Sequence, residues 1–364
     1  MRTAFLLLVT VIGLRAGDAL HFYFIDVEEG SSTLIVAPSG QNLLVDAGSR
    51  GNHGRDVRRV MSALNNAGAN CIDYLLVTHY HNDHYGAVAE LAAKVPVRHI
   101  IDHGPSVEAG KDTVWQKHWE ISVDDKQFAE YCAIRDRVRY TIARAGDRIP
   151  IRGVDVLVLA SGNDTLTHAL PGGGQANPYC AITPLRSEDE TEDGQSIGIL
   201  GSFGKFRFLS MGDRTWDRLW RFFCPNNPVG TVDVYMTSHH AMSIDKEIGG
   251  EVRWGRSGTP EVEVCALRPR VAILNYGERY HRLGTPRGWQ VVRNSPGLED
   301  FWQLHYQIGG GPENNVPEHF IANLSAQECQ GHWIKLSAHR DGSFTVINRR
   351  NGYRKDYKSA RESR

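Results

Sequence analysis

The chain has 364 residues and a formal net charge of −1, with 41 Lys and Arg residues against 42 Asp and Glu residues. This near-neutral balance excludes bulk electrostatic attraction to nucleic acid or to acidic membranes. Hydrophobic residues make up 41% and charged residues 23%, which is typical of a soluble globular protein. The length allows one large domain or two smaller ones.

The first 19 residues have the pattern of a secretory signal peptide. Arg2 precedes a short apolar run over residues 4–14, and small residues follow up to Ala19. The run is too short for a comfortable membrane span, and no other stretch is apolar enough to cross a bilayer. We therefore expect cleavage near residues 16–19 and a soluble mature protein in the periplasm or outside the cell. An uncleaved start that leads into the first strand is the alternative.

The cysteines are scattered, with no Cys-x-x-Cys pair, so a structural zinc knuckle is not expected. They are Cys71, Cys132, Cys180, Cys224, Cys265 and Cys329. An oxidising compartment would permit disulfides among them, but the pairing cannot be read from the sequence. Cys71 and Cys265 lie next to apolar residues, and we expect both to be buried thiols.

Apolar runs typical of strands and one amphipathic stretch make up the first part of the chain. A helix is predicted over residues 54–67, where apolar residues recur at steps of three and four. The expected strands are residues 21–27, 32–38, 42–46 and 71–77. The first two form a hairpin around a turn at residues 28–30. Asp46 ends the third strand.

Three histidines and one aspartate fall within six positions after the fourth strand, at His79, His81, Asp83 and His84. Residues 87–94 then predict a helix, so the cluster lies at the carboxyl edge of a sheet, where α/β folds place their sites. In an extended segment His79 and His81 point the same way, whereas Asp83 and His84 face another direction. One loop can thus serve two metal ions with ligands that suit zinc. A polar loop that happens to be rich in histidine is the alternative.

The rest of the chain predicts further strands and two helices. The strands are residues 97–102, 138–142, 154–160, 196–202, 205–211, 232–237, 271–275, 332–337 and 343–348, and the helices are residues 126–137 and 286–292. The strands over 138–142 and 154–160 are expected to start the second half of the fold. Residues 106–137 are interpreted as a flap over the site. Residues 161–194 are interpreted as a surface loop without function, with a substrate-gating loop as the alternative.

The histidine motif resembles the signature of the metallo-β-lactamase superfamily. Over about residues 20–350 the chain is similar to the branch related to the hydrolase domain of the competence protein ComEC. The segments that carry this resemblance are residues 24–27, Gly30, 31–36, 43–48, the histidine motif, 205–213 and 233–240. The resemblance implies an α/β fold, the metallo-β-lactamase αββα four-layer sandwich.

Three segments follow from these patterns. Residues 1–19 are the signal peptide and residues 20–350 the hydrolase domain. Residues 351–364 are a basic tail, interpreted as a solvated, frayed terminus with weak anionic contact as the alternative. Since no membrane channel segment accompanies the domain, we do not expect a full ComEC-type DNA importer.

The resemblance also implies two metal ions held by side chains from separate strand ends. The implied ligands are His79, His81, Asp83, His84, His103, Asp213 and His240. Asp213 bridges the two ions, with a helix N-cap as its alternative role. His103 is the candidate third ligand of the first ion, because it follows a strand beside the sheet edge. His118 and His168 compete with it for this place.

Further roles are expected around the metal ligands. Asp83 also orients the nucleophile or takes up its proton. His239 contacts the substrate or the transition state, although the roles of His239 and His240 can be reversed. Asp46 holds the metal loop by hydrogen bonds, and a turn-capping role does not exclude this. Asn275 and Tyr276 are placed at the mouth of the site.

The resemblance implies hydrolysis by a metal-activated hydroxide. The cofactors are two divalent metal ions, with Zn²⁺ favoured by ligand type and Mn²⁺ or Fe as alternatives. The expected substrate is a small or polymeric phosphodiester, such as a nucleic acid or a phosphorylated polymer, and no stable nucleic-acid partner is predicted. A lactone, β-lactam or other carboxylic-ester hydrolase is one alternative. A metal-bearing binding module with little turnover is the other.

Overall fold

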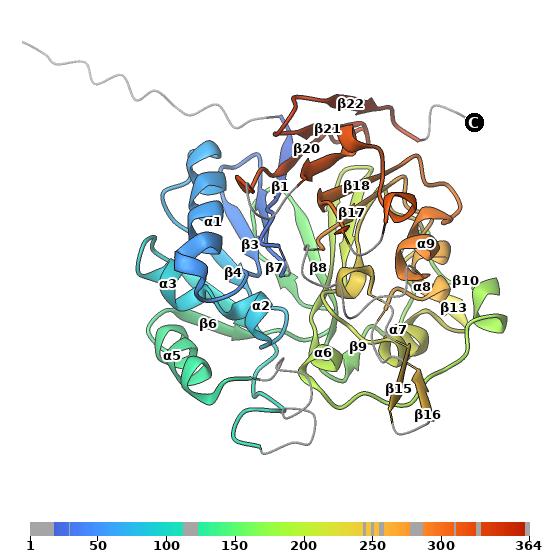
Figure 1. Ribbon diagram of the computed structural model, residues 1–364, viewed down its shortest axis with the longest axis horizontal. Helices are drawn as coiled ribbons and strands as arrows, with labels where there is room; N and C mark the ends of the chain where they lie inside the picture. Colours follow the sequence, from blue (N-terminus) through green and yellow to red (C-terminus); the bar gives the residue numbers. More distant parts are fainter. Residues whose placement is uncertain are drawn as a thin grey trace, which may run out of the picture.

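The structure is a computed structural model. It describes residues 18–28, 30–111, 123–242, 245–248, 251–254, 258–276, 287–308, 311–324 and 329–360. Among these residues, two nine-stranded sheets face each other and helices cover the outer face of each sheet (Figure 1). This arrangement is the expected αββα four-layer sandwich.

The first sheet contains both ends of the described chain. Its order is β22 (Arg354–Tyr357), β21 (Phe344–Asn348), β20 (Ile334–Ala338), β1 (Leu20–Phe24), β2 (Thr33–Val36), β3 (Asn42–Val45), β4 (Tyr74–Leu76), β5 (His99–Asp102) and β6 (Arg139–Ile142). The strands from β22 to β3 pair antiparallel, and those from β3 to β6 pair parallel. The predicted hairpins β1–β2 and β20–β21 are both confirmed.

The second sheet is largely parallel on the side that reaches the site. Its order is β19 (Ile321–Asn323), β18 (Asp300–His305), β17 (Val271–Leu274), β14 (Val234–Met236), β12 (Phe206–Ser210), β11 (Gly198–Phe203), β8 (Asp155–Ser161) and β7 (Arg148–Ile149), with β9 (Asp164–Thr165) paired to β8. Two small ribbons join β10 (Gln175–Ala176) to β13 (Asn226–Asn227) and β15 (Asp245–Ile248) to β16 (Glu251–Trp254).

Helices form the two outer layers. Those against the first sheet are α1 (Arg55–Asn66), α3 (Val88–Ala92) and α5 (Asp125–Arg135), and those against the second are α7 (Trp216–Phe223), α8 (Glu261–Leu267) and α9 (Arg287–Arg293) (Figure 1). The short helices α2 (Asn82–Tyr85), α6 (Glu192–Gln195) and η3 (Ser238–Ala241) lie in loops that reach the site. The remaining turns are η1 (Asn52–Gly54), η2 (Pro178–Ala181), η5 (Pro312–Asn314) and η6 (Glu318–Phe320).

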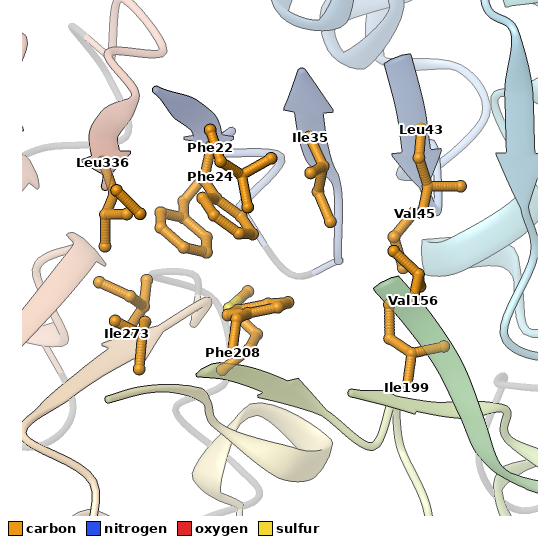
Figure 2. Close-up of a cluster of buried hydrophobic side chains, with 14 of the residues drawn as sticks. Phe22, Phe24, Ile35, Leu43, Val45, Val156, Ile199, Phe208, Ile273 and Leu336 are labelled. Atoms are coloured by element: carbon orange, nitrogen blue, oxygen red, sulfur yellow. The ribbon is translucent and has the colours of Figure 1, made fainter. Parts of the chain in front are cut away.

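The main hydrophobic core lies between the two sheets. Phe22 and Phe24 on β1 point across to Phe208 on β12, with ring centroids 4.8 and 6.0 Å from it (Figure 2). Tyr23, between them in the sequence, faces the opposite way and packs in the cluster under the helices. Burying each of these aromatic side chains contributes about 1.5–3 kcal/mol. Because both faces of the sheet are covered, its strands read as continuous apolar runs.

Two expectations about strand placement are wrong. β6 pairs parallel with β5 at the edge of the first sheet and does not start the second half of the fold. Residues 354–357 are not a frayed tail, because they form β22 along β21. Tyr357 explains this order: its ring stacks on Phe344 at 4.5 Å, and its hydroxyl donates to Asp300 at 2.7 Å.

Some expectations concern residues that the structure does not describe. Most of the predicted signal peptide, the central part of the predicted flap (residues 112–122) and His118 lie outside the described residues. Within the described ranges, no helix has the length and apolar character of a membrane span. Cys180 and Cys224 form a disulfide, while Cys71 and Cys265 are buried free thiols as expected.

Candidate metal centre

The histidine loop connects β4 to α3 at the carboxyl end of the parallel strands, as predicted. His79, His81 and His84 are almost fully buried, with exposed fractions of 0, 4 and 0%. His81 precedes α2, and His84 lies inside it. The change from extended backbone to helix at His81 turns the later side chains toward a different point from the earlier ones.

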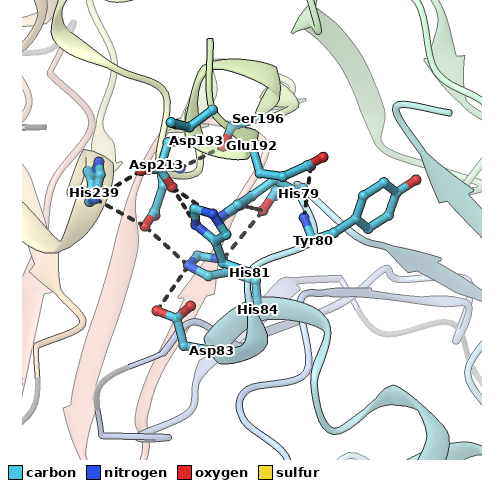
Figure 3. A network of polar contacts seen from close by, with 12 residues as sticks. His79, Tyr80, His81, Asp83, His84, Glu192, Asp193, Ser196, Asp213 and His239 are labelled. Atoms are coloured by element: carbon cyan, nitrogen blue, oxygen red, sulfur yellow. Dashed lines mark hydrogen bonds and ion pairs between the residues drawn. The ribbon is translucent and has the colours of Figure 1, made fainter. Parts of the chain in front are cut away.

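One group of metal-ligating atoms forms around His79, His81 and Asp193. Asp193 Oδ1 lies 2.7 Å from His81 Nδ1 and 3.4 Å from His79 Nε2 (Figure 3). Asp193 belongs to α6, directly before β11 in the second sheet. The group therefore joins loops from both sheets.

A second group forms around Asp83, His84, Asp213 and His240. Asp213 Oδ2 lies 3.3 Å from His84 Nε2 and 3.1 Å from His240 Nε2, and Asp83 Oδ2 lies 3.5 Å from His240 Nε2. Asp213 follows β12 and His240 follows β14, which are parallel neighbours. Their carboxyl ends therefore reach the same sheet edge, as the strand pattern predicts.

His239 faces both groups. Its Nε2 lies 3.8 Å from Asp193 Oδ2 and 3.7 Å from Asp213 Oδ2. His239, His240 and Ala241 have φ values of 46, 53 and 53°, so three consecutive non-glycine residues adopt left-handed backbone. Such conformations are strained and concentrate at functional sites. The turn that carries this histidine pair is therefore tight although it lacks glycine.

Asp46 makes the hydrogen bonds to the metal loop that its position predicts. Its Oδ2 accepts hydrogen bonds from His84 Nδ1 at 2.7 Å and from Thr78 Oγ1 at 2.9 Å, while Oδ1 accepts from Thr78 N at 2.8 Å. Because Nδ1 of His84 donates to Asp46, Nε2 is the ring nitrogen that faces the second group. The Asn275 backbone carbonyl accepts in the same way from His240 Nδ1 at 2.8 Å.

His103 does not join either group, so its assignment as the third ligand of the first ion is wrong. It does follow β5 near the site, but its Nε2 lies 2.9 Å from Glu192 Oε2. Burial raises the pKa of Glu192, but hydrogen bonds from His103 and Ser106 outweigh this and hold that pKa at about 2. Glu192 is therefore ionised and engages His103. His168, the other described competitor, is exposed.

Asp193 takes the position that was expected for a histidine. The segment over residues 161–194 therefore supplies one side chain to this group of ligating atoms. Glu108, from the start of the predicted flap, also approaches, with Oε1 3.5 Å from His81 Nε2 and accepting from Glu192 N at 3.0 Å. The only sequence signal for Asp193 is an acidic pair directly before a predicted strand, and this pattern is common in ordinary loops.

The charges at the site fit divalent cations. Burial raises the pKa of Asp213, but nearby His240 and His84 outweigh this and hold that pKa well below its usual range. The pKa of Asp193 is likewise low, because His81 and His239 oppose the effect of burial. Among the described residues, the buried Nε2 atoms of His79 and His84 have no hydrogen-bond partner. Buried imidazoles facing ionised carboxylates are a donor set that zinc and similar metals prefer.

Residues 25–177, less than half of the chain, match the family model described as "Metallo-beta-lactamase superfamily". No curated protein matches the sequence significantly.

Several solved structures are similar to this chain. The metallo-beta-lactamase fold protein YhfI from Bacillus subtilis is 10% identical over 79% of this chain and 96% of its own, with a TM-score of 0.44. The diiron beta-hydroxylase CmlA from Streptomyces venezuelae is 13% identical over 78% of this chain and 48% of its own, with a TM-score of 0.42. The metallo hydrolase Igni18 from Ignicoccus hospitalis is 11% identical over 79% of this chain and 95% of its own, with a TM-score of 0.40.

Proposed function

We propose that this protein is a dinuclear metal-dependent hydrolase that cleaves a phosphodiester. The observation that carries the proposal is the position of Asp213 between the other ligands. Its Oδ2 lies 3.1–3.7 Å from ring nitrogens of His84, His240 and His239, while Asp193 faces His239 from the other group. A single carboxylate between two donor groups is the arrangement that holds two ions as a pair.

The paired arrangement favours phosphoryl chemistry. A pair of divalent ions held by these residues would supply a water of lowered pKa and would offset the negative charge on the attacking and the leaving oxygen. The similarity of residues 205–213 and 233–240 to the ComEC-related branch supports the same substrate class.

The chain's own residues have separate tasks in this proposal. His79, His81 and Asp193 would hold one ion, and Asp83, His84 and His240 would hold the other, with Asp213 near both. His239, which faces both carboxylates, contacts the substrate oxygens as charge develops on them. Asp83 also orients the attacking water. The buried hydrogen bonds that His84 and His240 donate to the Asp46 carboxylate and the Asn275 carbonyl keep these two imidazoles aimed at the ions.

We also propose that the protein works in the periplasm or outside the cell. The signal-like residues 1–19 support this location, as does the Cys180–Cys224 disulfide, since disulfides persist mainly in oxidising compartments.

A substrate panel tests the proposed activity. The purified protein, loaded with zinc or manganese, is expected to hydrolyse bis-p-nitrophenyl phosphate, and both His79→Ala and Asp213→Ala are expected to abolish this activity. Nitrocefin and a lactone are assayed in parallel. A wild-type protein that opens either of these and leaves the phosphodiester intact would show the substrate class to be wrong. A metal-loaded protein that is inert on the whole panel would instead indicate a binding module.

A further inference from the structure

A third group of ligating side chains lies outside the metal centre, at Asp26, His305 and Cys329. Asp26 follows β1 in the first sheet, whereas His305 ends β18 in the second sheet. Cys329 lies between β19 and β20, where the chain returns from the second sheet to the first. The group therefore spans the two sheets and shares no residue with the groups described above.

The three side chains converge within the range of a single ion. One ligand atom from each lies within 4.8 Å of the others. Cys329 Sγ lies 3.3 Å from Asp26 Oδ2. Asp26 and His305 are buried, with exposed fractions of 1 and 0%. An imidazole, a thiolate and a carboxylate are the three side-chain types that bind zinc.

His305 is the residue that points most directly to a ligand. Its Nδ1 donates to the Tyr306 carbonyl at 3.1 Å, so the lone pair of the neutral ring is on Nε2. This Nε2 atom is buried and has no hydrogen-bond partner in the part of the chain that the structure describes. Leaving a buried acceptor unsatisfied costs about 1–3 kcal/mol, and a cation at this point would remove that cost.

Neighbouring residues make hydrogen bonds to Asp26 and Cys329, the other two side chains of the group. Asp26 Oδ1 accepts a hydrogen bond from Glu28 N at 2.8 Å, which leaves Oδ2 facing Cys329. Arg59 Nη2 donates to Cys329 Sγ at 2.9 Å, but burial and the neighbouring Asp26 outweigh this and raise the pKa of the Cys329 thiol to about 12. A bound ion therefore has to displace the thiol proton. Glu28 lies 3.4 Å from Arg59 and offsets its positive charge. Bonds of this kind from neighbouring groups are a regular feature of metal sites.

A cavity supplies a path to the group. It has a volume of about 440 Å³ and is lined by Cys329, Arg59, Trp333 and Arg349, among others. Cys329 is the member of the group that faces it, so water can reach the sulfur from this side, although Arg55 and Arg58 also line the cavity and make it basic.

We propose that Asp26, His305 and Cys329 form a separate mononuclear zinc site, with a water molecule from the cavity in the fourth position. Cys329 loses its thiol proton when the ion binds. The bound ion links β1 of the first sheet to β18 of the second and stabilises the contact between the two sheets.

Cobalt substitution tests this site independently of the metal centre. The described groups at the metal centre contain no cysteine, so a sulfur-to-cobalt charge-transfer band in the near ultraviolet reports only on Cys329. The cobalt-loaded wild type is expected to show this band and to bind about three ions per chain. Cys329→Ser is expected to lose the band and about one ion. Cys132→Ser, which removes another partly exposed free thiol, is the matched control and keeps both.

X-ray absorption at the zinc edge gives a second test that needs no variant. In the wild-type protein, a sulfur neighbour at about 2.3 Å is expected. A wild type without the cobalt band and without this sulfur neighbour would overturn the proposal. A band that persists in Cys329→Ser would overturn it as well.

Discussion

His81 Nδ1 lies 2.7 Å from Asp193 Oδ1, and this contact joins the histidine loop after β4 to the short helix α6 before β11. The first group therefore combines two imidazoles with a carboxylate. Carboxylate ligands suit harder ions such as manganese better than a third imidazole would. The contact thus bears directly on which ions this site accepts.

Replacing Asp193 should remove one ion from the centre. Asp193→Ala deletes a carboxylate that both His79 and His81 face, so we expect the total metal content to fall by about one ion per chain. Elemental analysis after exhaustive dialysis measures this. His103→Gln is the matched control, because glutamine can still donate to Glu192, and it should leave the metal content unchanged. The reverse result would restore His103 as the ligand.

Asp46→Asn should weaken metal binding without removing any ligand. The amide group of asparagine cannot accept hydrogen bonds at both positions that Asp46 occupies, so His84 would lose its orientation. We expect metal affinity to fall about 10–100-fold, measured by competition with a chelator. Thr78→Ser keeps the hydroxyl that Asp46 engages and should bind metal like the wild type. Equal affinities for Asp46→Asn and wild type would show that Asp46 only caps its turn.

Glu263 should make stability fall as the pH rises. Burial raises its pKa to about 7, although hydrogen bonds from Ser238 and Tyr235 oppose the shift. In the unfolded chain the pKa is about 4.3. Between these values the folded protein keeps a proton that the unfolded chain has lost, so the free energy of unfolding decreases as the pH rises from about 4.3 through about 7. The total loss is about 4 kcal/mol.

Glu263→Gln tests this effect, because the amide keeps a hydrogen-bonding group in the same place but does not titrate. Urea unfolding across this pH range should show a wild-type stability that declines relative to the variant. The difference between the two proteins cancels the contribution of other titrating groups. Parallel pH profiles for the two proteins would mean that Glu263 ionises normally in the fold.

The Cys180–Cys224 disulfide should stabilise the second half of the fold. It joins η2 to the end of α7 and closes a loop with a sequence separation of 44. Reduction, or the double variant Cys180→Ser with Cys224→Ser, should lower the free energy of unfolding by about 2–4 kcal/mol. Chemical unfolding with and without reductant measures this. Cys132→Ser should be insensitive; a similar loss in that variant would indicate a general effect of thiol removal.

Much of the site could be predicted because the apolar runs in the sequence show where the strands end. β4, β12 and β14 read as buried apolar runs, and each is followed by His or Asp residues. Carboxyl ends of neighbouring parallel strands meet at one edge, so Asp213 and His240 could be placed together without contact information.

Asp193 could not be predicted in the same way. It belongs to a long segment without hydrophobic periodicity, and its position depends on how that whole segment folds across the first sheet's loops. His103 shows the complementary difficulty. It follows a strand end as predicted, but Glu192 from the same irregular segment engages its ring nitrogen.

The local sequence pattern also could not predict which sheet a strand joins. β6 reads as a strand in the sequence, yet nothing in residues 139–142 indicates that it pairs with β5. β22 has the polar sequence Arg-Lys-Asp-Tyr, and it is held in place by Tyr357 packing against residues far away in the chain. Such long-range contacts decide the outcome where local preference is weak.

Anomalous diffraction from crystals of the zinc-loaded protein tests the central claim most directly. We predict two strong peaks about 3.5–4 Å apart, with one near His79, His81 and Asp193, the other near Asp83, His84 and His240, and Asp213 between them. A single peak at this position, or none, would contradict the dinuclear centre on which the proposed hydrolase rests.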